Sequence, residues 1–269
     1  MKTISTALLL TMNLLCVSGH EMNKEYQKLV YDFIDCFKSN DHEELVAKTI
    51  YPFERTYPIP EIKNSQEFLK RYTEVFDDSL VEKIIKAGPS VDWSEVAWRC
   101  VMLFDGVVWL NQNGNLISVN YQTKVEKRKR EELIRLEKKT LDESLQKFKQ
   151  PICIIETSTF QIRFDDLGEG NFRYASWALK NKMSDKPDLV IKNGEYIPEG
   201  SGGNHIYHFK NQDYVYDCSI FVLSEAYTPA QFLSIYKSGK EILSQKANKL
   251  LNRNCSQGKN IKILNRSLS

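Results

Sequence analysis

Apolar side chains recur every three or four positions in the first part of the chain. The clearest run lies within 21–38 and comprises Tyr26, Leu29, Val30, Phe33, Ile34 and Phe37. This spacing is typical of one face of an amphipathic helix. Asp41 and Asn64 each precede another such run, and both residue types are favoured N-caps. We therefore predict helices over 21–38, after Asp41, and from Asn64 onward, the last with further turns through Ile85.

The period changes to two after Gly88-Pro89. Alternating apolar and polar residues predict strands over 96–104, 107–111 and 115–121. Asp105-Gly106 and Asn113-Gly114 separate these strands, and both dipeptides suit tight hairpin turns. We therefore expect the helices to be followed directly by an antiparallel meander.

The segment 124–149 differs from both neighbours in its charge. Sixteen of its 26 residues are Asp, Glu, Lys or Arg, and it contains neither Gly nor Pro. A sparse apolar stripe at helical spacing consists of Ile134, Leu141, Leu145 and Phe148. These features predict a long, solvated helix that links two domains and rests one edge on a neighbour. A coiled coil would need a fuller heptad pattern.

From Ile152 onward, short alternating segments predict strands over 160–164, 172–179, 189–191, 205–209, 214–223, 232–236 and 241–245. Asn193-Gly194, residues 211–213 and Ser238-Gly239 are the expected turns. The pattern indicates a compact antiparallel β domain, either a small sandwich or a curled sheet. The chain thus divides into 20–123, a charged helical linker over 124–150, and a β domain over 151–250. A tail over 251–269 is expected to fray.

Residues 1–19 have the composition of a secretory signal peptide. Lys2 supplies a positive charge, an apolar stretch runs from Ala7 to Leu15, and Val17-Ser18-Gly19 provides small residues. We expect cleavage after Gly19 and a periplasmic or secreted protein. Lipidation of Cys16 is the alternative, but Asn13-Leu14-Leu15 lacks the small residues that normally precede a lipidated cysteine. The apolar stretch is shorter than the ~20 residues of a membrane-spanning helix, so no transmembrane segment is expected in the mature chain.

Removal of Cys16 with the signal peptide leaves an odd number of cysteines, namely Cys36, Cys100, Cys153, Cys218 and Cys255. An oxidising compartment allows at most two disulfides among them, and their pairing is left open. No Cys-x-x-Cys pair occurs, which argues against a zinc knuckle or a thioredoxin-type site. The formal net charge of +2 is too small for the positive field of a nucleic-acid-binding protein.

Two sets of residues carry resemblances to known proteins. Residues 51–53, 62–68, 72–76, 105–109 and 117–121, within 21–123, resemble the NTF2-like superfamily, which includes SnoaL-like and ketosteroid-isomerase-like proteins. This resemblance implies an α+β fold in which helices and a curved antiparallel sheet form a cone with an open mouth. We expect Trp98, Trp109 and Tyr121 to line its pocket. Isomerase or hydratase chemistry there would need an inward carboxylate base, and no residue is assigned to that role.

The second set lies in the C-terminal half. Residues 172–177, 186–191 and 200–205 are similar to an uncharacterised bacterial exported β module, and this similarity implies no activity. Gly200–Gly203 leads into an alternating strand rather than a helix, so we expect a flexible connection and not a phosphate loop.

The best cluster of candidate ligand-binding residues is Arg173, Trp177, Asn204 and His205. Arg173 and Trp177 lie four apart and therefore share one face of a strand, where an exposed Arg–Trp pair would form a recognition patch. A buried Trp177 would instead be core. His205 and His208 are three apart, which puts them on opposite faces of a strand, so neither a metal site nor a cofactor is expected.

Nucleophilic hydrolysis has no sequence support, because neither a Gly-x-Ser-x-Gly elbow nor a cysteine in a nucleophile context occurs. We expect an exported bacterial protein that binds a small ligand, a peptide or a partner protein in the cell envelope without catalysis. Two alternatives stay open. One is an isomerase or hydratase-type enzyme that uses the N-terminal pocket, and the other is an envelope inhibitor or immunity protein against a secreted toxin.

Overall fold

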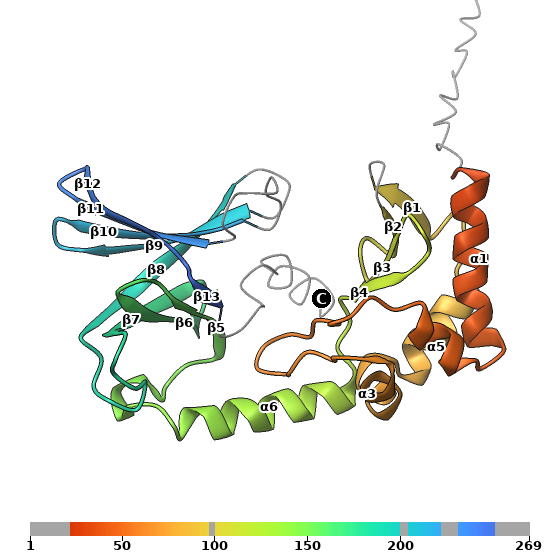
Figure 1. Cartoon of the computed structure of the whole chain (residues 1–269), viewed down its shortest axis with the longest axis horizontal. Helices are drawn as coiled ribbons and strands as arrows, with labels where there is room; N and C mark the ends of the chain where they lie inside the picture. Colours follow the sequence, from red (N-terminus) through yellow and green to blue (C-terminus); the bar gives the residue numbers. More distant parts are fainter. Residues whose placement is uncertain (1–21, 97–99, 200–203, 222–230, 251–269) are drawn as a thin grey trace, which may run out of the picture.

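The computed structural model describes residues 22–96, 100–199, 204–221 and 231–250. These residues form two antiparallel sheets, of four and nine strands, and several helices (Figure 1). The expected signal peptide over 1–19 and the expected tail over 251–269 lie outside the described residues. No helix in the described part of the chain combines the length and apolarity needed to cross a membrane.

Short helices come first in the chain: α1 Lys24–Lys38, α2 His42–Ala47, α3 Ser65–Lys70, α4 Tyr72–Val75 and α5 Asp78–Lys86. The Asp41 carboxylate accepts from the Glu44 amide at 2.9 Å, and the Asn64 side chain accepts from the Glu67 amide at 3.0 Å. Both predicted N-caps are therefore confirmed. The helix predicted from Asn64 is interrupted, because Phe76 is extended and Asp77 caps a new helix through the Leu80 amide.

The first sheet is a meander of four-residue strands: β1 Trp93–Val96, β2 Cys100–Leu103, β3 Val108–Asn111 and β4 Leu116–Val119. The predicted strand 96–104 is wrong as a single unit, because Val96 pairs with Cys100 across two antiparallel strands. The two predicted turn dipeptides do separate β2 from β3 and β3 from β4. Their glycines have positive φ, 100° at Gly106 and 77° at Gly114, which a Cβ-bearing residue rarely adopts.

The expected fold class, a cone of helices and a curved sheet followed by a helical linker and a β domain, is wrong. The chain is mostly β and consists of two antiparallel sheets with short helices. The strands β1 to β4 have only four residues each, which is too short to curve around an open interior. Aromatic rings fill the space between this sheet and its helices, including Phe33, Phe37, Phe76 and Trp93.

The charged segment 124–149 is helical only as far as Lys138, and this helix is exposed over most of its length, as predicted, while both of its ends are packed. Helix α6 spans Lys124–Lys138 and lies between the two sheets, and the 3-10 helix η1 follows at Glu143–Leu145 (Figure 1). The first turn of α6 is held by a buried ion pair in which Arg55 Nε donates to Glu126 Oε1 at 2.5 Å. The predicted apolar stripe is buried on Ala175 and Trp177, but only Ile134 of its four members belongs to the helix.

The second sheet contains β5 Gln150–Glu156, β6 Phe160–Gly168, β7 Asn171–Ala178, β8 Leu189–Glu199, β9 Asn204–Asn211, β10 Tyr214–Ile220, β11 Gln231–Lys237, β12 Lys240–Lys246 and β13 Lys249–Leu250. Strands β5 to β12 are neighbours in chain order, and β13 pairs with β5 at the other edge. The sheet curls into a half-barrel. Phe164 on β6 therefore stacks on Tyr207 and Phe209 of β9, with ring centroids 5.7 and 5.8 Å apart.

Strand β8 forms the corner of this half-barrel. Its first part pairs with β7 and its second part, Glu195–Glu199, pairs with β9. Between them Asn193 has a φ of 62°, and its amide donates to the Asn171 side chain at 2.9 Å. The turn predicted at Asn193-Gly194 is therefore a bend within one strand, because a single residue with positive φ redirects the strand without reversing it.

Cysteines divide into two groups. Cys36, Cys100 and Cys218 are free thiols, whereas Cys153 on β5 is disulfide-bonded. Cys153 is 1 % exposed and belongs to the core of the half-barrel. The chain therefore carries a disulfide, although three of the five cysteines expected in the mature protein are reduced.

Candidate functional site

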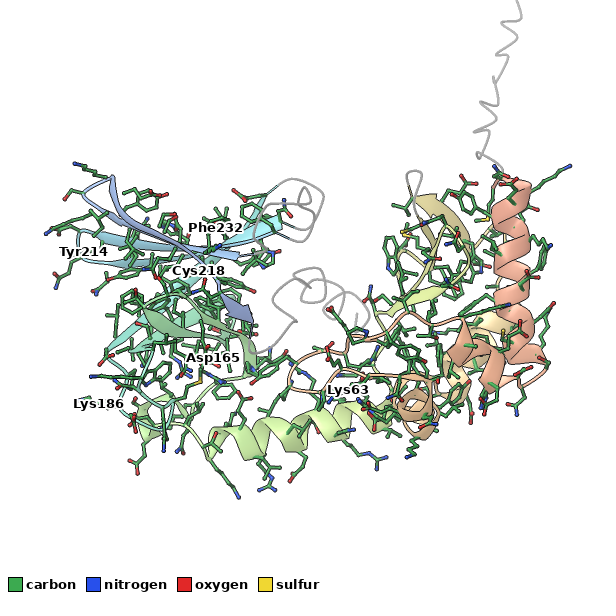
Figure 2. The ribbon with its side chains drawn as sticks, viewed as in Figure 1. Lys63, Asp165, Lys186, Tyr214, Cys218 and Phe232 are labelled. Atoms are coloured by element: carbon green, nitrogen blue, oxygen red, sulfur yellow. The ribbon has the colours of Figure 1, made fainter. Side chains whose placement is uncertain are left out.

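Charged side chains are buried on the face of the half-barrel that packs against the segment after α6. Arg163 and Asp165 lie two apart on β6 and therefore share a face, and Asp165 pairs directly with Arg173 on β7. All three are at most 1 % exposed. Figure 2 shows Asp165 on the α6 side of the sheet and Cys218 farther from that helix. Strand periodicity and register together create this cluster.

Asp165 joins the two arginines. Its Oδ1 accepts from Arg163 Nε at 2.9 Å, and its Oδ2 accepts from Arg173 Nε at 3.2 Å and Nη2 at 2.5 Å. Arg163 Nη1 also donates to Glu137 Oε1 at 2.5 Å, which ties the end of α6 to the sheet. Two guanidinium groups and two carboxylates thus form a network with no net charge.

The network extends to the N-terminal half of the chain through Tyr57. The Tyr57 hydroxyl donates to the same Glu137 Oε1 at 2.5 Å. Burial, reinforced by the Glu137 charge, raises the pKa of Tyr57, so this hydroxyl stays protonated. Burial lowers the pKa of Arg163, but the carboxylates of Asp165 and Glu137 outweigh that effect and raise it overall. The Arg163 guanidinium therefore keeps its charge at neutral pH.

Phe148 packs under the cations of this network. The Arg163 and Arg173 guanidinium carbons lie 4.9 and 5.8 Å from the centroid of its ring, and the Lys138 ammonium lies 4.5 Å away. These distances are those of cation–π contacts. The aromatic ring thereby holds the segment 145–148 against the sheet.

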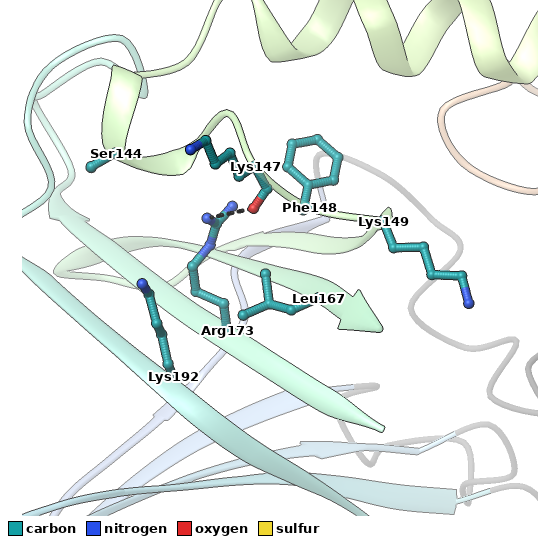
Figure 3. Close-up of a pocket in the computed structure, with 7 residues that line it drawn as sticks. All are labelled: Ser144, Lys147, Phe148, Lys149, Leu167, Arg173 and Lys192. Atoms are coloured by element: carbon teal, nitrogen blue, oxygen red, sulfur yellow. Dashed lines mark hydrogen bonds between the residues drawn. The ribbon is translucent and has the colours of Figure 1, made fainter. Parts of the chain in front are cut away.

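A cavity of about 600 Å³ opens beside Arg173 (Figure 3). It is lined by Ser144, Lys147, Phe148, Lys149, Leu167, Arg173 and Lys192. Lys147 and Lys192 approach the Arg173 guanidinium from two different segments, the loop before β5 and strand β8 (Figure 3). Arg173 is anchored at the base by donating to the backbone oxygens of Leu145 at 2.6 Å and of Lys147 at 3.2 Å.

The lining of this cavity carries an uncompensated positive charge. Lys147, Lys149 and Lys192 are exposed, and none forms an ion pair with any residue that the structure describes. Asp165 already neutralises Arg173 as part of the network. Figure 3 shows the ammonium groups of Lys147 and Lys192 on the Arg173 side of the cavity, whereas that of Lys149 points away from Arg173. An anion beside Arg173 would relieve the repulsion between the first two charges. The arrangement is therefore suited chemically to hold an anionic group.

The predicted recognition patch is only partly a surface feature. Arg173 and Trp177 do share the face of β7 that packs on the 141–148 segment, but Trp177 is fully buried and Arg173 is 1 % exposed. Trp177 is core, and its indole N–H donates to the Asp185 carbonyl at 2.9 Å. Arg173 contributes to the cavity only through the end of its guanidinium.

Asn204 and His205 lie elsewhere. His205 is buried and packs on Tyr196 and Tyr207, with ring centroids 4.8 and 5.3 Å away. Tyr207 belongs to the core on the opposite face of the sheet from Trp177. The structure therefore does not bring the four predicted binding residues together. His208 faces away from His205 and pairs with Asp217 at 2.7 Å. The described residues contain no group of three or more side chains able to hold a metal ion.

Trp109 and Tyr121, two of the residues expected to line an N-terminal pocket, each form a hydrogen bond within that half of the chain. The Trp109 indole donates to the Gly106 carbonyl at 2.8 Å, and the Tyr121 hydroxyl donates to the Asp77 carboxylate at 2.9 Å. Both side chains are half-buried. Trp109 contacts the turn between β2 and β3, and Tyr121 contacts the N-cap residue of α5. Trp98 lies outside the described residues.

Sequence reasoning missed Lys147, Lys149 and Lys192. The first two belong to a charge-rich segment predicted to be a solvated helix, where unpaired lysines are ordinary. Lys192 is 43 residues away from Lys149 along the chain, so only the sheet topology could place it at the same cavity. The one signal in the sequence that pointed to this cavity was Arg173, which was selected because it shares a strand face with Trp177.

Comparison with known proteins adds nothing to the functional argument. No family model, no curated protein and no solved structure matches this chain.

Proposed function

We propose that this chain is an exported, non-enzymatic binding protein of the bacterial cell envelope, and that it takes an anionic ligand in the cavity beside Arg173. The observation that carries this proposal is the placement of Lys147 and Lys192, which have no ion-pair partners among the described residues, beside Arg173 at one cavity (Figure 3). The cavity volume of about 600 Å³ is within the range of ordinary small-molecule sites, ~300–1,000 Å³.

Two features support export. Residues 1–19 have the layout of a secretory signal, and Cys153 is disulfide-bonded. Disulfides persist mainly in oxidising compartments, so this bond fits a periplasmic or secreted location. Expression of the full chain in a bacterial host, followed by fractionation and mass spectrometry of the N-terminus, tests this part. A mature protein that begins at His20 is expected, and a cytoplasmic, uncleaved chain would contradict it.

The enzyme alternative is not proposed, because it depended on an open cone that the structure does not have. The charged network beside the cavity also has a structural role, since each of its carboxylates is directed at an arginine. Binding without chemistry is the function that these contacts favour.

Calorimetric titration with inorganic phosphate, sulfate and citrate tests anion binding. At low salt we expect at least one of them to bind, with an affinity that falls as ionic strength rises. The double variant Lys147→Ala/Lys192→Ala should lose at least tenfold in affinity. Lys240→Ala, which removes an exposed lysine of β12 that does not line the cavity, is the matched control and should bind normally. No binding by any of the three, or equal binding by the double variant, would refute the proposal.

A further inference from the structure

The donors around the cavity restrict the kind of anion that it can hold. We propose that the cavity selects a phosphate monoester over a carboxylate, an inference that rests on the anion-binding function proposed above. It deepens that function by naming the ligand class.

The first argument is the state of the Arg173 fork. Arg173 directs Nε and Nη2 at Asp165 Oδ2, and Nη2 also donates to the Leu145 carbonyl. Nη1 donates to the Lys147 carbonyl at 3.2 Å. A guanidinium has five N–H groups, so one remains, on Nη1. The Nε/Nη2 edge, which can bind a carboxylate or a phosphate through two parallel N–H groups, is occupied by Asp165, so Arg173 offers an incoming anion a single N–H and the lysines must distinguish the ligands.

The second argument concerns the lysines. An ammonium group is a compact point charge without a fixed fork, and it suits phosphate oxygens that point in several directions. Lys147 and Lys192 provide two such charges beside Arg173, with no ion pair to the described residues. A phosphate monoester carries about −1.5 to −2 at neutral pH, which balances them better than the single charge of a carboxylate.

The third argument concerns the rest of the ligand. The cavity is about 600 Å³, far larger than inorganic phosphate requires, and Phe148 and Leu167 add apolar surface to its lining. Figure 3 shows Leu167 directly beside the aliphatic part of Arg173. An ester with an organic group can therefore place its charged end among the ammonium groups and its apolar end against Leu167.

Titrations with phenyl phosphate and benzoate test this inference, because the two share a ring and differ in the anion. At pH 7.5 and constant ionic strength we expect phenyl phosphate to bind at least tenfold more tightly. Its affinity should fall between pH 7.5 and pH 5, as the phosphate takes up a proton with a pKa of about 6. Equal or tighter binding of benzoate, still dependent on Lys147 and Lys192, would overturn the ligand class and leave the anion site standing. Absence of binding by both ligands, together with inorganic phosphate, sulfate and citrate, would overturn the proposed function itself.

A phosphate monoester group can belong to a soluble metabolite or to a lipid headgroup. Cosedimentation with phosphatidylcholine vesicles, prepared with and without phosphatidic acid, distinguishes the two. Sedimentation only with phosphatidic acid, abolished in Lys147→Ala/Lys192→Ala, assigns the headgroup. Binding of phenyl phosphate without cosedimentation assigns a soluble ester.

Discussion

The surroundings of Cys36 and Cys218 lower the reactivity of their thiols. Burial raises the pKa of the Cys36 thiol to about 11, and nearby Glu44 adds to this effect. Burial also raises the pKa of Cys218 well above the ordinary value of 9.0. At pH 8, a pKa near 11 leaves about a hundredfold less thiolate than an ordinary cysteine has. Both thiols should therefore react with a disulfide reagent far more slowly in the native protein than in urea.

The same shifts give the pH dependence its sign. An unfolded cysteine releases its proton near pH 9, whereas the native Cys36 holds it to about pH 11. The contribution of this thiol to stability is complete below pH 9 and is lost as pH rises toward 11. Urea unfolding at pH 8 and pH 10.5 should show a Cys36→Ser variant losing less stability over that interval than the native protein. Equal losses would contradict the assignment.

At the residue scale, the sequence could indicate Arg173 and Trp177 as a pair but not their environment. Their spacing of four places them on one face of a strand, and the structure has them there. Their burial depends on the 141–148 segment, which folds back over β7, and on Asp165 at the opposing register position. Neither contact follows from local spacing, because each joins residues that are distant along the chain.

Strand β8 has no room for a side chain at Gly194, the residue that follows its bend. A Cβ added at Gly194 would lie 2.1 Å from Phe209 Cε1 and 2.3 Å from Cδ1, and Phe209 is completely buried. Gly194→Ala therefore forces β8 away from β9 or displaces the ring. Overpacking of this kind costs about 1–3 kcal/mol. Denaturant unfolding should show a loss in this range.

A double variant provides the control for that prediction. Phe209→Leu removes the ring atoms that the new Cβ would meet, so Gly194→Ala should cost much less in the Phe209→Leu background than in the native chain. If the two substitutions were simply additive, the ring contact could not be the reason for glycine at this position.

At the element scale, the sequence predicted helix caps and turns correctly where neighbouring residues determine them. The caps at Asp41 and Asn64 and the turns at Gly106 and Gly114 depend on side chains or φ values within a few positions. The prediction of a turn at Asn193-Gly194 was wrong, because the same dipeptide can close a hairpin or bend a strand, and the strands that pair on either side decide which occurs. Alternation located β6 to β12 of the second sheet, but it could not show that this sheet curls, because curling depends on contacts such as Phe164 with Phe209.

At the scale of the whole molecule, α6 connects the two sheets through an ion pair at each end. Arg55 and Glu126 hold its first turn to the N-terminal half, and their side chains are only 3 % and 1 % exposed. Arg55 also donates to the Val119 carbonyl of β4 at 2.7 Å. At the other end, Glu137 binds Arg163 of the half-barrel. The charge-rich composition correctly predicted a helix that is exposed along most of its length, but it could not show the ion pairs that hold both ends of that helix.

The Glu126→Gln variant tests whether this connection makes the molecule unfold as one unit. It leaves the Arg55 charge buried without its carboxylate, and breaking a buried pair in this way costs about 3–5 kcal/mol. Because Glu137 still holds α6 to the half-barrel, the loss should fall on the N-terminal half. Calorimetry should then resolve an earlier transition, and hydrogen exchange should accelerate in β3 while β6 stays protected. Glu132→Gln, which breaks only the exposed pair with Arg135 on the same helix, should change neither. A single transition at the native midpoint in Glu126→Gln would mean that the two sheets are coupled by contacts other than this ion pair.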